Sequence, residues 1–219
     1  MLCQFSVKNY KSIRDEVTLD MQAAAISEHE DRIIKDQDGE MYLPVSAIYG
    51  PNGGGKSNVL AAFHTLIAKI LRPLFATEDN DEKVFFQRKI IVEPFAFSES
   101  KNEPTEFELF FRTDLAEYRY VLHVKRDIVI YESLDRVKLE TGRRSALFQR
   151  NNNGIDLKGA FAKLKVSDDL SKTLTLLSYL GIAYKGNAVV KDVLNWFEYG
   201  VEFLNYGNPI QELKMAVST

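Results

Sequence analysis

The order of hydrophobic and polar residues predicts strands at the start of the chain. Residues 3–7 alternate between apolar and polar side chains, and residues 17–21 repeat the same period of two. Such alternation is typical of half-buried strands, and the turn-like residues 11–15 between the two runs predict that the strands pair. Residues 27–40 are mostly polar or charged, which indicates a surface loop.

The pattern changes near residue 45. Residues 45–49 form a short, mostly apolar run, as expected of a buried parallel strand. A glycine-rich stretch follows, and from Val59 to Leu71 the apolar residues recur with the spacing of an amphipathic helix. Pro73 is predicted to end this helix. A strand, a glycine loop and a helix therefore follow one another within residues 43–72.

The rest of the chain is predicted to hold an antiparallel meander and then helices. Between residues 84 and 148, short runs of period two are separated by short polar linkers. Helical spacing returns over about 167–180 and again over about 189–197. The acidic run 78–82 is interpreted as a solvated loop.

Composition and charge narrow the class of protein. The chain has 219 residues, of which 45% are hydrophobic and 27% charged, as is usual for a globular protein. Its net charge of −3 gives no overall basic field for nucleic acid, but leaves room for a local basic patch such as Arg143-Arg144. Cys3 is the only cysteine, which excludes an internal disulfide and indicates a reducing, cytoplasmic location.

Membrane and metal signals are weak in the sequence. We expect no apolar run long enough to span a bilayer and see no signal-peptide pattern, so no membrane partner is predicted. His29, His64 and His123 are far apart, and with a single cysteine they show no metal-ligand spacing.

The glycine-rich stretch carries the clearest chemistry. Residues 50–57 fit the phosphate-binding pattern G-x-x-x-x-G-K-[ST]. Glycines let the backbone wrap a polyphosphate, consecutive N–H groups bind the anion, and the helix N-terminus adds a partial positive charge. Lys56 is expected to act on the β- and γ-phosphates as the catalytic residue, and the Ser57 hydroxyl is expected to bind Mg²⁺. The predicted nucleotide-binding residues are Gly50, Pro51, Asn52, Gly53, Gly54, Gly55, Lys56, Ser57 and Asn58.

Other stretches extend this motif into a family resemblance. They are Phe5-Ser6-Val7-Lys8-Asn9-Tyr10-Lys11-Ser12, Pro94-Phe95-Ala96-Phe97, and Glu132-Ser133-Leu134 followed by Leu147-Phe148-Gln149-Arg150. With the loop, they make the chain resemble the N-terminal half of an ABC-type AAA-like ATPase. The relatives are prokaryotic ATPases akin to SMC, RecF and OLD proteins, many of which belong to phage-defence or DNA-repair systems. The resemblance covers nearly the whole chain.

The resemblance implies an α/β fold, a P-loop NTPase of the ABC-type head-lobe kind with a β-rich antiparallel arm and C-terminal helices. Residues 1–83 would hold the N-terminal strands with the phosphate-loop strand and helix, residues 84–158 the arm, and residues 159–219 a helical segment. The head would be incomplete, because the sequence shows no signature motif and no convincing acid-terminated strand. We therefore expect the natural protein to continue beyond Thr219.

The implied activity is that of an ATPase with ATP and Mg²⁺ as cofactors. Two heads, in a homodimer or with a second ATPase head, would close around ATP and drive an effector protein or a DNA-linked process. In such relatives, a basic residue of the Asn-aromatic-basic-Ser segment lies near the phosphates. Lys11 and Ser12 are therefore added to the expected nucleotide contacts, although Lys11 can also be read as a solvated turn lysine.

The sequence offers few candidates for the missing catalytic carboxylate. Glu93 and Glu132 each end a strand-like run, and each is either a catalytic or Mg²⁺-linked acid or a surface charge on a strand. Gln87 and Gln149 are poor candidates for the glutamine that contacts Mg²⁺ in ABC relatives. A chain without these parts would bind ATP but hydrolyse it slowly.

Alternative functions remain open at this point. A complete small P-loop kinase would need a mobile basic lid, which Arg143-Arg144 would supply, but the β-meander argues against it. A GTPase is disfavoured because no Asn-Lys-x-Asp segment follows the loop. A third interpretation is a degenerate nucleotide-binding scaffold that holds a partner without turnover.

Overall fold

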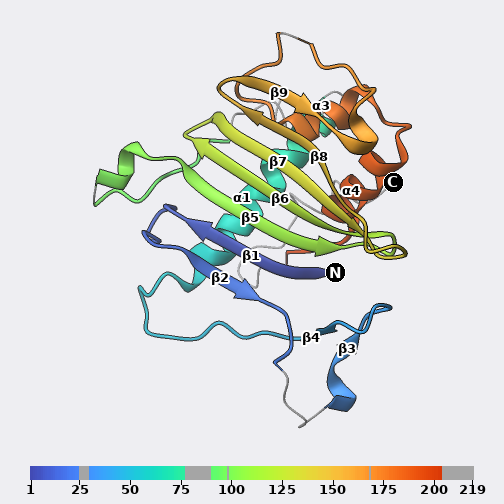
Figure 1. Cartoon of the computed structure of the whole chain (residues 1–219). Coiled ribbons are helices and arrows are strands. Elements are labelled where there is room, and N and C mark those ends of the chain that lie inside the picture. Colours follow the sequence, from blue (N-terminus) through green and yellow to red (C-terminus); the bar gives the residue numbers. More distant parts are fainter. Residues whose placement is uncertain (25–29, 77–89, 98, 168, 204–219) are drawn as a thin grey trace.

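Seven antiparallel strands form the main sheet of the protein (Figure 1). The computed structural model describes residues 1–24, 30–76, 90–97, 99–167 and 169–203. The order of the strands in the sheet is β2-β1-β5-β6-β7-β8-β9. Their bounds are β1 (Leu2–Lys8), β2 (Val17–Asp20), β5 (Thr105–Arg112), β6 (Ala116–Lys125), β7 (Ile128–Lys138), β8 (Arg144–Asn151) and β9 (Gly154–Leu157).

Two runs of strands join in this sheet. β1 pairs with β2, with Phe5 opposite Leu19, which confirms the predicted pair at the start of the chain. β5 to β9 follow one another as a meander, which confirms the predicted antiparallel arrangement. Because β1 also pairs with β5, with Phe5 opposite Leu109, the N-terminal strands and the meander form one continuous sheet.

Three helices in the described part of the chain cover one face of the sheet (Figure 1). They are α1 (Lys56–Phe75), α3 (Leu176–Ala183) and α4 (Ala188–Tyr199). On α1, Phe63 packs against Phe5 of β1 with 4.9 Å between ring centroids. On α4, Trp196 stacks on Phe111 of β5 at 4.3 Å. These contacts belong to one hydrophobic core between the sheet and the helices, so the domain has mixed α/β structure.

Short elements occupy the connections between these parts. They are η1 (Glu30–Arg32), β3 (Ile34–Lys35), β4 (Met41–Tyr42), η2 (Glu99–Asn102) and η3 (Gly159–Phe161). The acidic run 78–82 and Gln87, both considered above, lie outside the described residues.

The expected buried parallel strand over 45–49 is wrong. These residues are not in a strand, and Val45 and Tyr49 are 78% and 92% exposed. A strand needs hydrogen-bonded neighbours, and none of the described strands pairs with this segment. Apolar composition alone therefore did not decide its structure.

Two helix boundaries also differ from the sequence-based expectation. Pro73 lies inside the last turn of α1, which continues to Phe75. The helix expected over 167–180 begins only at Leu176. The polar residues before it form turns instead: Asp169 donates its backbone N–H to the Ser167 hydroxyl, and Thr173 donates its own to the Ser171 hydroxyl, each at 3.3 Å. Such local hydrogen bonds compete with the helix.

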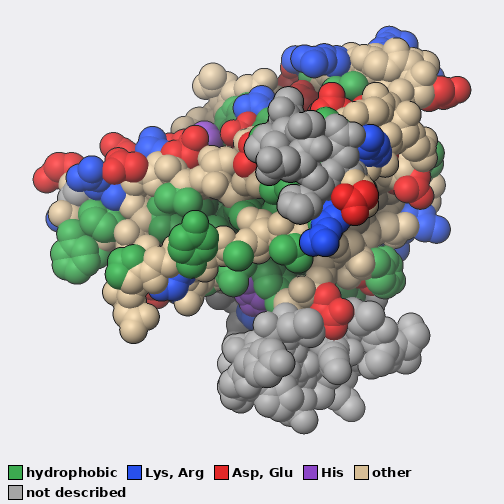
Figure 2. Space-filling model, turned by 90° about the horizontal axis from the view of Figure 1, so that it is seen from below, with side chains coloured by type: hydrophobic (Ala, Val, Ile, Leu, Met, Phe, Trp, Pro, Cys, Tyr) green, Lys and Arg blue, Asp and Glu red, His purple; other side chains and the backbone are tan. Residues whose placement is uncertain are grey.

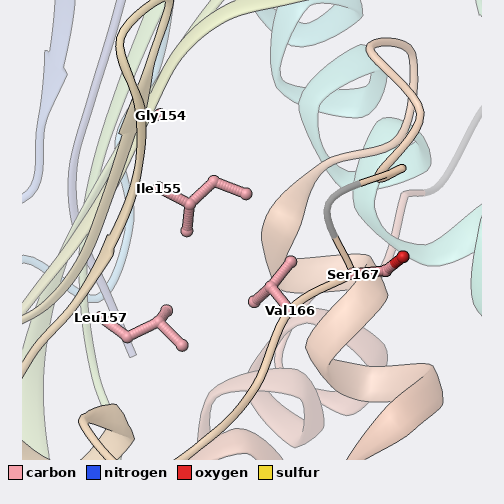
Figure 3. Close-up of a pocket in the computed structure, with 5 residues that line it drawn as sticks. All are labelled: Gly154, Ile155, Leu157, Val166 and Ser167. Atoms are coloured by element: carbon pink, nitrogen blue, oxygen red, sulfur yellow. The ribbon is translucent and has the colours of Figure 1, made fainter.

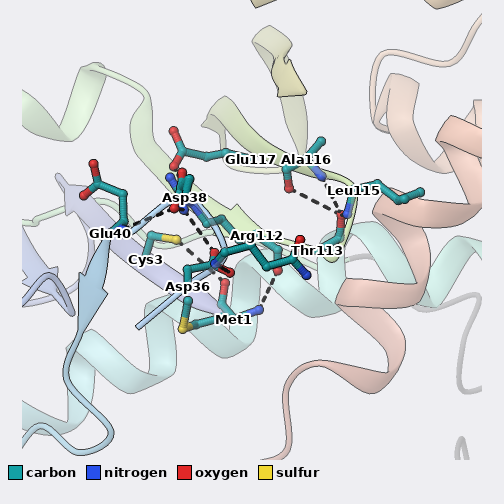
Figure 4. A network of polar contacts seen from close by, with 11 residues as sticks. Met1, Cys3, Asp36, Asp38, Glu40, Arg112, Thr113, Leu115, Ala116 and Glu117 are labelled. Carbon is teal, nitrogen blue, oxygen red and sulfur yellow. Dashed lines mark hydrogen bonds and ion pairs between the residues drawn. The ribbon is translucent and has the colours of Figure 1, made fainter. Parts of the chain in front are cut away.

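A buried ion-pair network anchors residues 36–42 to the sheet (Figure 4). Arg112 of β5 is 7% exposed and donates to Asp38, Glu117 and Asp36 at 2.7, 2.8 and 3.0 Å. The hydrogen bond from Arg112 holds the pKa of Asp38 below its usual value. The described part of the predicted surface loop thus contains a small hairpin, β3 with β4, that is fastened to the sheet.

Helix α1 is long and apolar enough, by length and composition alone, to cross a membrane, contrary to the expectation from the sequence. The core helix of a globular domain passes the same test. Its residues Leu66 and Ile70 are fully buried in the hydrophobic core beneath the sheet. We therefore interpret α1 as a core helix that carries the glycine-rich loop at its start.

Candidate functional site

The glycine-rich loop ends where α1 begins. Residues 50–54 are exposed, and the helix starts at Lys56 with Gly55 as its N-cap. Gly53 and Gly55 have φ angles of 81° and 83°, a left-handed conformation that other residues rarely adopt. The two glycines therefore let the chain turn twice in quick succession and enter the helix immediately afterwards.

Backbone amides at the helix start form a donor cluster. In the described chain, the N–H groups of Gly55, Lys56 and Ser57 have no protein acceptor, as expected at the first turn of a helix. No acidic residue stands in that turn to neutralise the helix dipole. This end of α1 therefore offers amide donors and a partial positive charge, the combination that binds phosphate groups.

The side chain of Lys56 folds back over the loop. Its Nζ donates to the carbonyl oxygens of Gly50 and Pro51 at 2.7 and 2.8 Å. Gly54 N–H also donates to the Pro51 carbonyl at 3.2 Å, which closes the loop into a tight turn. The ammonium group is thus held at the mouth of the loop, where an incoming anion would compete with the two carbonyls for it.

The turn after β1 lies against the phosphate loop. Asn58 Nδ2 donates to the Ser12 hydroxyl at 2.7 Å, and a Cβ atom placed on Gly55 would lie 3.1 Å from the same Oγ. Ser12 is therefore brought to the loop. Lys11 is next to it in sequence, but its Nζ stands 5.4 Å from the centroid of the Tyr10 ring and forms no hydrogen bond with the described residues of the loop.

Two residues of the resembling segment that were not predicted as nucleotide contacts hold this turn in place. Asn9 is 1% exposed; its Nδ2 donates to the Ser100 carbonyl at 2.7 Å, and its Oδ1 accepts from Phe95 N–H at 3.0 Å. The Tyr10 hydroxyl lies 2.9 Å from the Thr65 hydroxyl on α1. The two resembling segments, around Asn9 and around Phe95, are thus joined in space, which their sequence separation hides.

Of the two candidate acids, Glu132 has a structural role. It is fully buried, and its carboxylate accepts from the N–H groups of Leu176 and Leu177 at 2.6 and 2.9 Å and from the Tyr120 hydroxyl at 2.9 Å. Burial raises the pKa of Glu132, and these hydrogen bonds oppose the rise. The carboxylate caps the start of α3, so the interpretation as a catalytic or surface charge is wrong.

Glu93 remains near the site, but only through its backbone. Its carbonyl accepts from Lys11 N–H at 2.9 Å, and its side chain is exposed. Gln149 lies on β8 opposite Ser133, within the sheet. The described residues contain no group of three or more His, Cys, Asp or Glu side chains that would hold a metal ion. Ser57, which is exposed at the start of α1, remains the candidate Mg²⁺ ligand.

A pocket of about 290 Å³ lies away from the phosphate loop, between β9 and residues 166–167 (Figure 3). Gly154, Ile155, Leu157, Val166 and Ser167 line it. None of these side chains titrates or carries charge near neutral pH, so the pocket has no group that would recognise a triphosphate. The glycine-rich loop, and not this pocket, is therefore the candidate nucleotide site.

The mixed α/β fold and the loop fit the class of P-loop NTPase domains. The glycine loop leads directly into a core helix with the lysine at the first helical position, as in that class, whereas the strand that usually precedes the loop is absent from the described residues. The family described as "AAA domain, putative AbiEii toxin, Type IV TA system" matches residues 45–206. The chain belongs to this family of AAA-like ATPases. A comparison with curated proteins gave no match.

Proposed function

We propose that the chain is the ATP-binding lobe of an ABC- or SMC-like ATPase. The observation that carries this proposal is the cluster of free amides at Gly55, Lys56 and Ser57, with the Lys56 ammonium held on the carbonyls of Gly50 and Pro51 in the same loop. The amides would bind the phosphate oxygens, and Lys56 would exchange its two carbonyl contacts for the β- and γ-phosphates. Ser57 would place its hydroxyl on Mg²⁺, which offsets phosphate charge when bound.

The Ser12 hydroxyl would contribute a further donor. Because it already accepts from Asn58, its own hydrogen is free to point toward the loop beside Gly55. Lys11 would reach the phosphates only after leaving the face of the Tyr10 ring. Asn58 itself would act through Ser12 and not through the nucleotide.

Hydrolysis would require a second head, as a homodimer or with another ATPase, to donate the parts that orient water. Glu132 is occupied by α3, and Glu93 approaches the site only by its backbone. Val45, Tyr49 and Leu60 are exposed apolar side chains close to the loop in sequence. Figure 2 shows hydrophobic side chains at the surface of the face that it displays. Exposed apolar surface of this kind favours coverage by another surface. We propose that head closure drives an effector or a DNA-linked process of a defence system in the cytoplasm, with little turnover by this chain alone.

Calorimetry with ATP and Mg²⁺ tests the site. Lys56→Ala should weaken binding about 100-fold, because it removes a charged donor to phosphate. Lys191→Ala, an exposed lysine on α4, is the matched control and should bind as the parent protein does. Unchanged affinity in Lys56→Ala would refute the site. ATP-dependent dimerisation in sedimentation would support the two-headed proposal, and a monomer at saturating ATP would contradict it.

A further inference from the structure

The main sheet ends at β9 with an open edge. Within the described part of the chain, β9 is the last strand of the sheet and pairs with β8 alone (Figure 1). The opposite edge is covered just after β2, where Leu43 N–H donates to the Met21 carbonyl at 2.7 Å. An uncovered edge strand presents free N–H and C=O groups with which another strand can pair.

The free backbone groups of β9 belong to Ile155 and Leu157. Lys158 N–H donates to the Leu147 carbonyl at 2.8 Å, which continues the ladder between β8 and β9 by one residue. Residues of an antiparallel strand alternate between those that bond to this neighbour and those that point away from it. Lys158 and Asp156 therefore bond toward β8, and the N–H and C=O groups of Ile155 and Leu157 point outward. No hydrogen bond joins these outward groups to another of the described residues.

The pocket described above lies beside these groups. Its volume is about 290 Å³, and Ile155, Leu157 and Val166 give it three aliphatic side chains. The side chains of Ile155 and Leu157 point from β9 toward Val166 (Figure 3). Every second side chain of a strand added to this edge would point the same way. An apolar cavity of about 150 Å³ holds a benzene-sized group, so the pocket has room for aliphatic side chains from such a strand.

The charges on the other face of β9 distinguish between partners. Asp156 and Lys158 form an exposed ion pair at 2.9 Å. If a second copy of the chain added its own β9, with Ile155 opposite Leu157 of the copy, Asp156 would stand directly opposite Asp156 of the copy. Like charges in that position destabilise a strand pair, whereas opposite charges stabilise it. The edge is thus better matched by a strand with a basic residue opposite Asp156 and an acidic residue opposite Lys158.

We propose that β9 binds an extended segment of a partner protein as an additional antiparallel strand. The segment carries aliphatic residues opposite Ile155 and Leu157, a basic residue opposite Asp156 and an acidic residue opposite Lys158. Main-chain hydrogen bonds would supply the contact, and the pocket and the ion pair would set its register. The proposal goes beyond the nucleotide site and uses none of its residues, so binding should survive Lys56→Ala.

Two peptides of identical composition test the register. The complementary peptide is acetyl-Thr-Glu-Val-Arg-Val-Thr-amide, and the control exchanges its Glu and Arg. The complementary peptide should bind at least about 5-fold more tightly, because two favourable charge pairs replace two unfavourable ones. A third peptide, with both valine nitrogens methylated, loses the donors for the carbonyls of Ile155 and Leu157 and should not bind.

Nuclear magnetic resonance of the full chain locates the contact. The amides of Ile155 and Leu157 should exchange rapidly with solvent in the free protein, and should shift and become protected when the complementary peptide binds. Val166→Ser removes an aliphatic wall of the pocket and should weaken binding by about 5-fold or more. Val45→Ser makes the same change at a position that is 78% exposed and should bind the peptide as the parent does.

Several results would overturn the proposal. Protection of both amides without peptide would show that the edge is already covered, by the chain itself if protection is independent of protein concentration and by a second copy if it rises with it. Equal affinity for the two charge-exchanged peptides, or undiminished binding of the methylated one, would contradict the assigned strand pairing. So would unchanged Ile155 and Leu157 amides at about 1 mM complementary peptide.

Discussion

Glu132 offers the most direct test of how the meander holds the helical layer. Its carboxylate, in the middle of β7, receives three hydrogen bonds in a fully buried position, two from the first turn of α3 and one from Tyr120. Glu132→Ala removes the acceptor and leaves all three donors buried without a partner. Glu132→Gln keeps the shape but turns part of the acceptor into an NH₂ group that opposes the α3 amides.

The size of the effect follows from these contacts. Each buried donor left without a partner costs about 1–3 kcal/mol, and such losses within one network are not additive. We therefore expect Glu132→Ala to lower the free energy of unfolding by about 4 kcal/mol and Glu132→Gln by about 2 kcal/mol. In a domain of this length, a 4 kcal/mol loss lowers Tm by roughly 10 °C.

Urea unfolding followed by tryptophan fluorescence measures this loss. Trp196 is the only tryptophan in the sequence, is 5% exposed and lies on α4 against the sheet, so it reports the separation of the two layers. The control is Glu140→Ala, which removes an exposed acid in the turn between β7 and β8. It should change the free energy of unfolding by less than about 0.5 kcal/mol. The reasoning is refuted if Glu132→Ala unfolds at the same urea concentration as the parent protein.

Two further predictions concern the loop and the ion-pair network. Gly55→Ala places a Cβ on a left-handed residue, 3.1 Å from Ser12 Oγ. Calorimetry should show that this variant binds ATP at least about 10-fold more weakly than the parent protein. The control Gly186→Ala, whose Cβ would meet no atom within 4 Å, should bind ATP as the parent protein does. Asp38→Asn should destabilise the fold at pH 7 by about 1 kcal/mol or less. Because the pKa of Asp38 is lowered by Arg112, its contribution is present above its usual value of 3.8 and is lost as the pH falls through the lowered pKa. The difference between Asp38→Asn and the parent protein in thermal unfolding should therefore shrink as the pH falls below 3.8, and a constant difference would contradict this.

Much of the sheet could be predicted because its residues follow a simple rule. Strands such as β5 and β6 alternate between buried and half-buried side chains, so their period of two is visible in the sequence. Residues 45–49 have the apolar composition of a buried strand but do not form one, because a strand also needs a neighbouring strand to pair with. The late start of α3 depends on serine and threonine side chains that bind the backbone locally, which hydrophobic spacing does not register.

The site was predicted in part for a similar reason. The loop from Gly50 to Lys56 is contiguous, and its chemistry is written in a short motif. The contact of Asn58 with Ser12 joins residues that are 46 positions apart, and the bond between Glu132 and Leu176 spans 44 positions. No periodicity in the sequence links such distant pairs. The sequence therefore could not show that Glu132 caps the start of α3.

The turn after β1 also limits what evolution can place at position 9. The side chain there must accept one hydrogen bond from Phe95 and donate to the carbonyls of Ser100, Glu103 and Pro104, while the backbone holds a φ of 56°. Aspartate would lack the donors, glutamine would be one methylene too long, and alanine would supply neither. Asparagine supplies both ends of this amide and tolerates a left-handed backbone, so we expect substitutions at position 9 to loosen this turn.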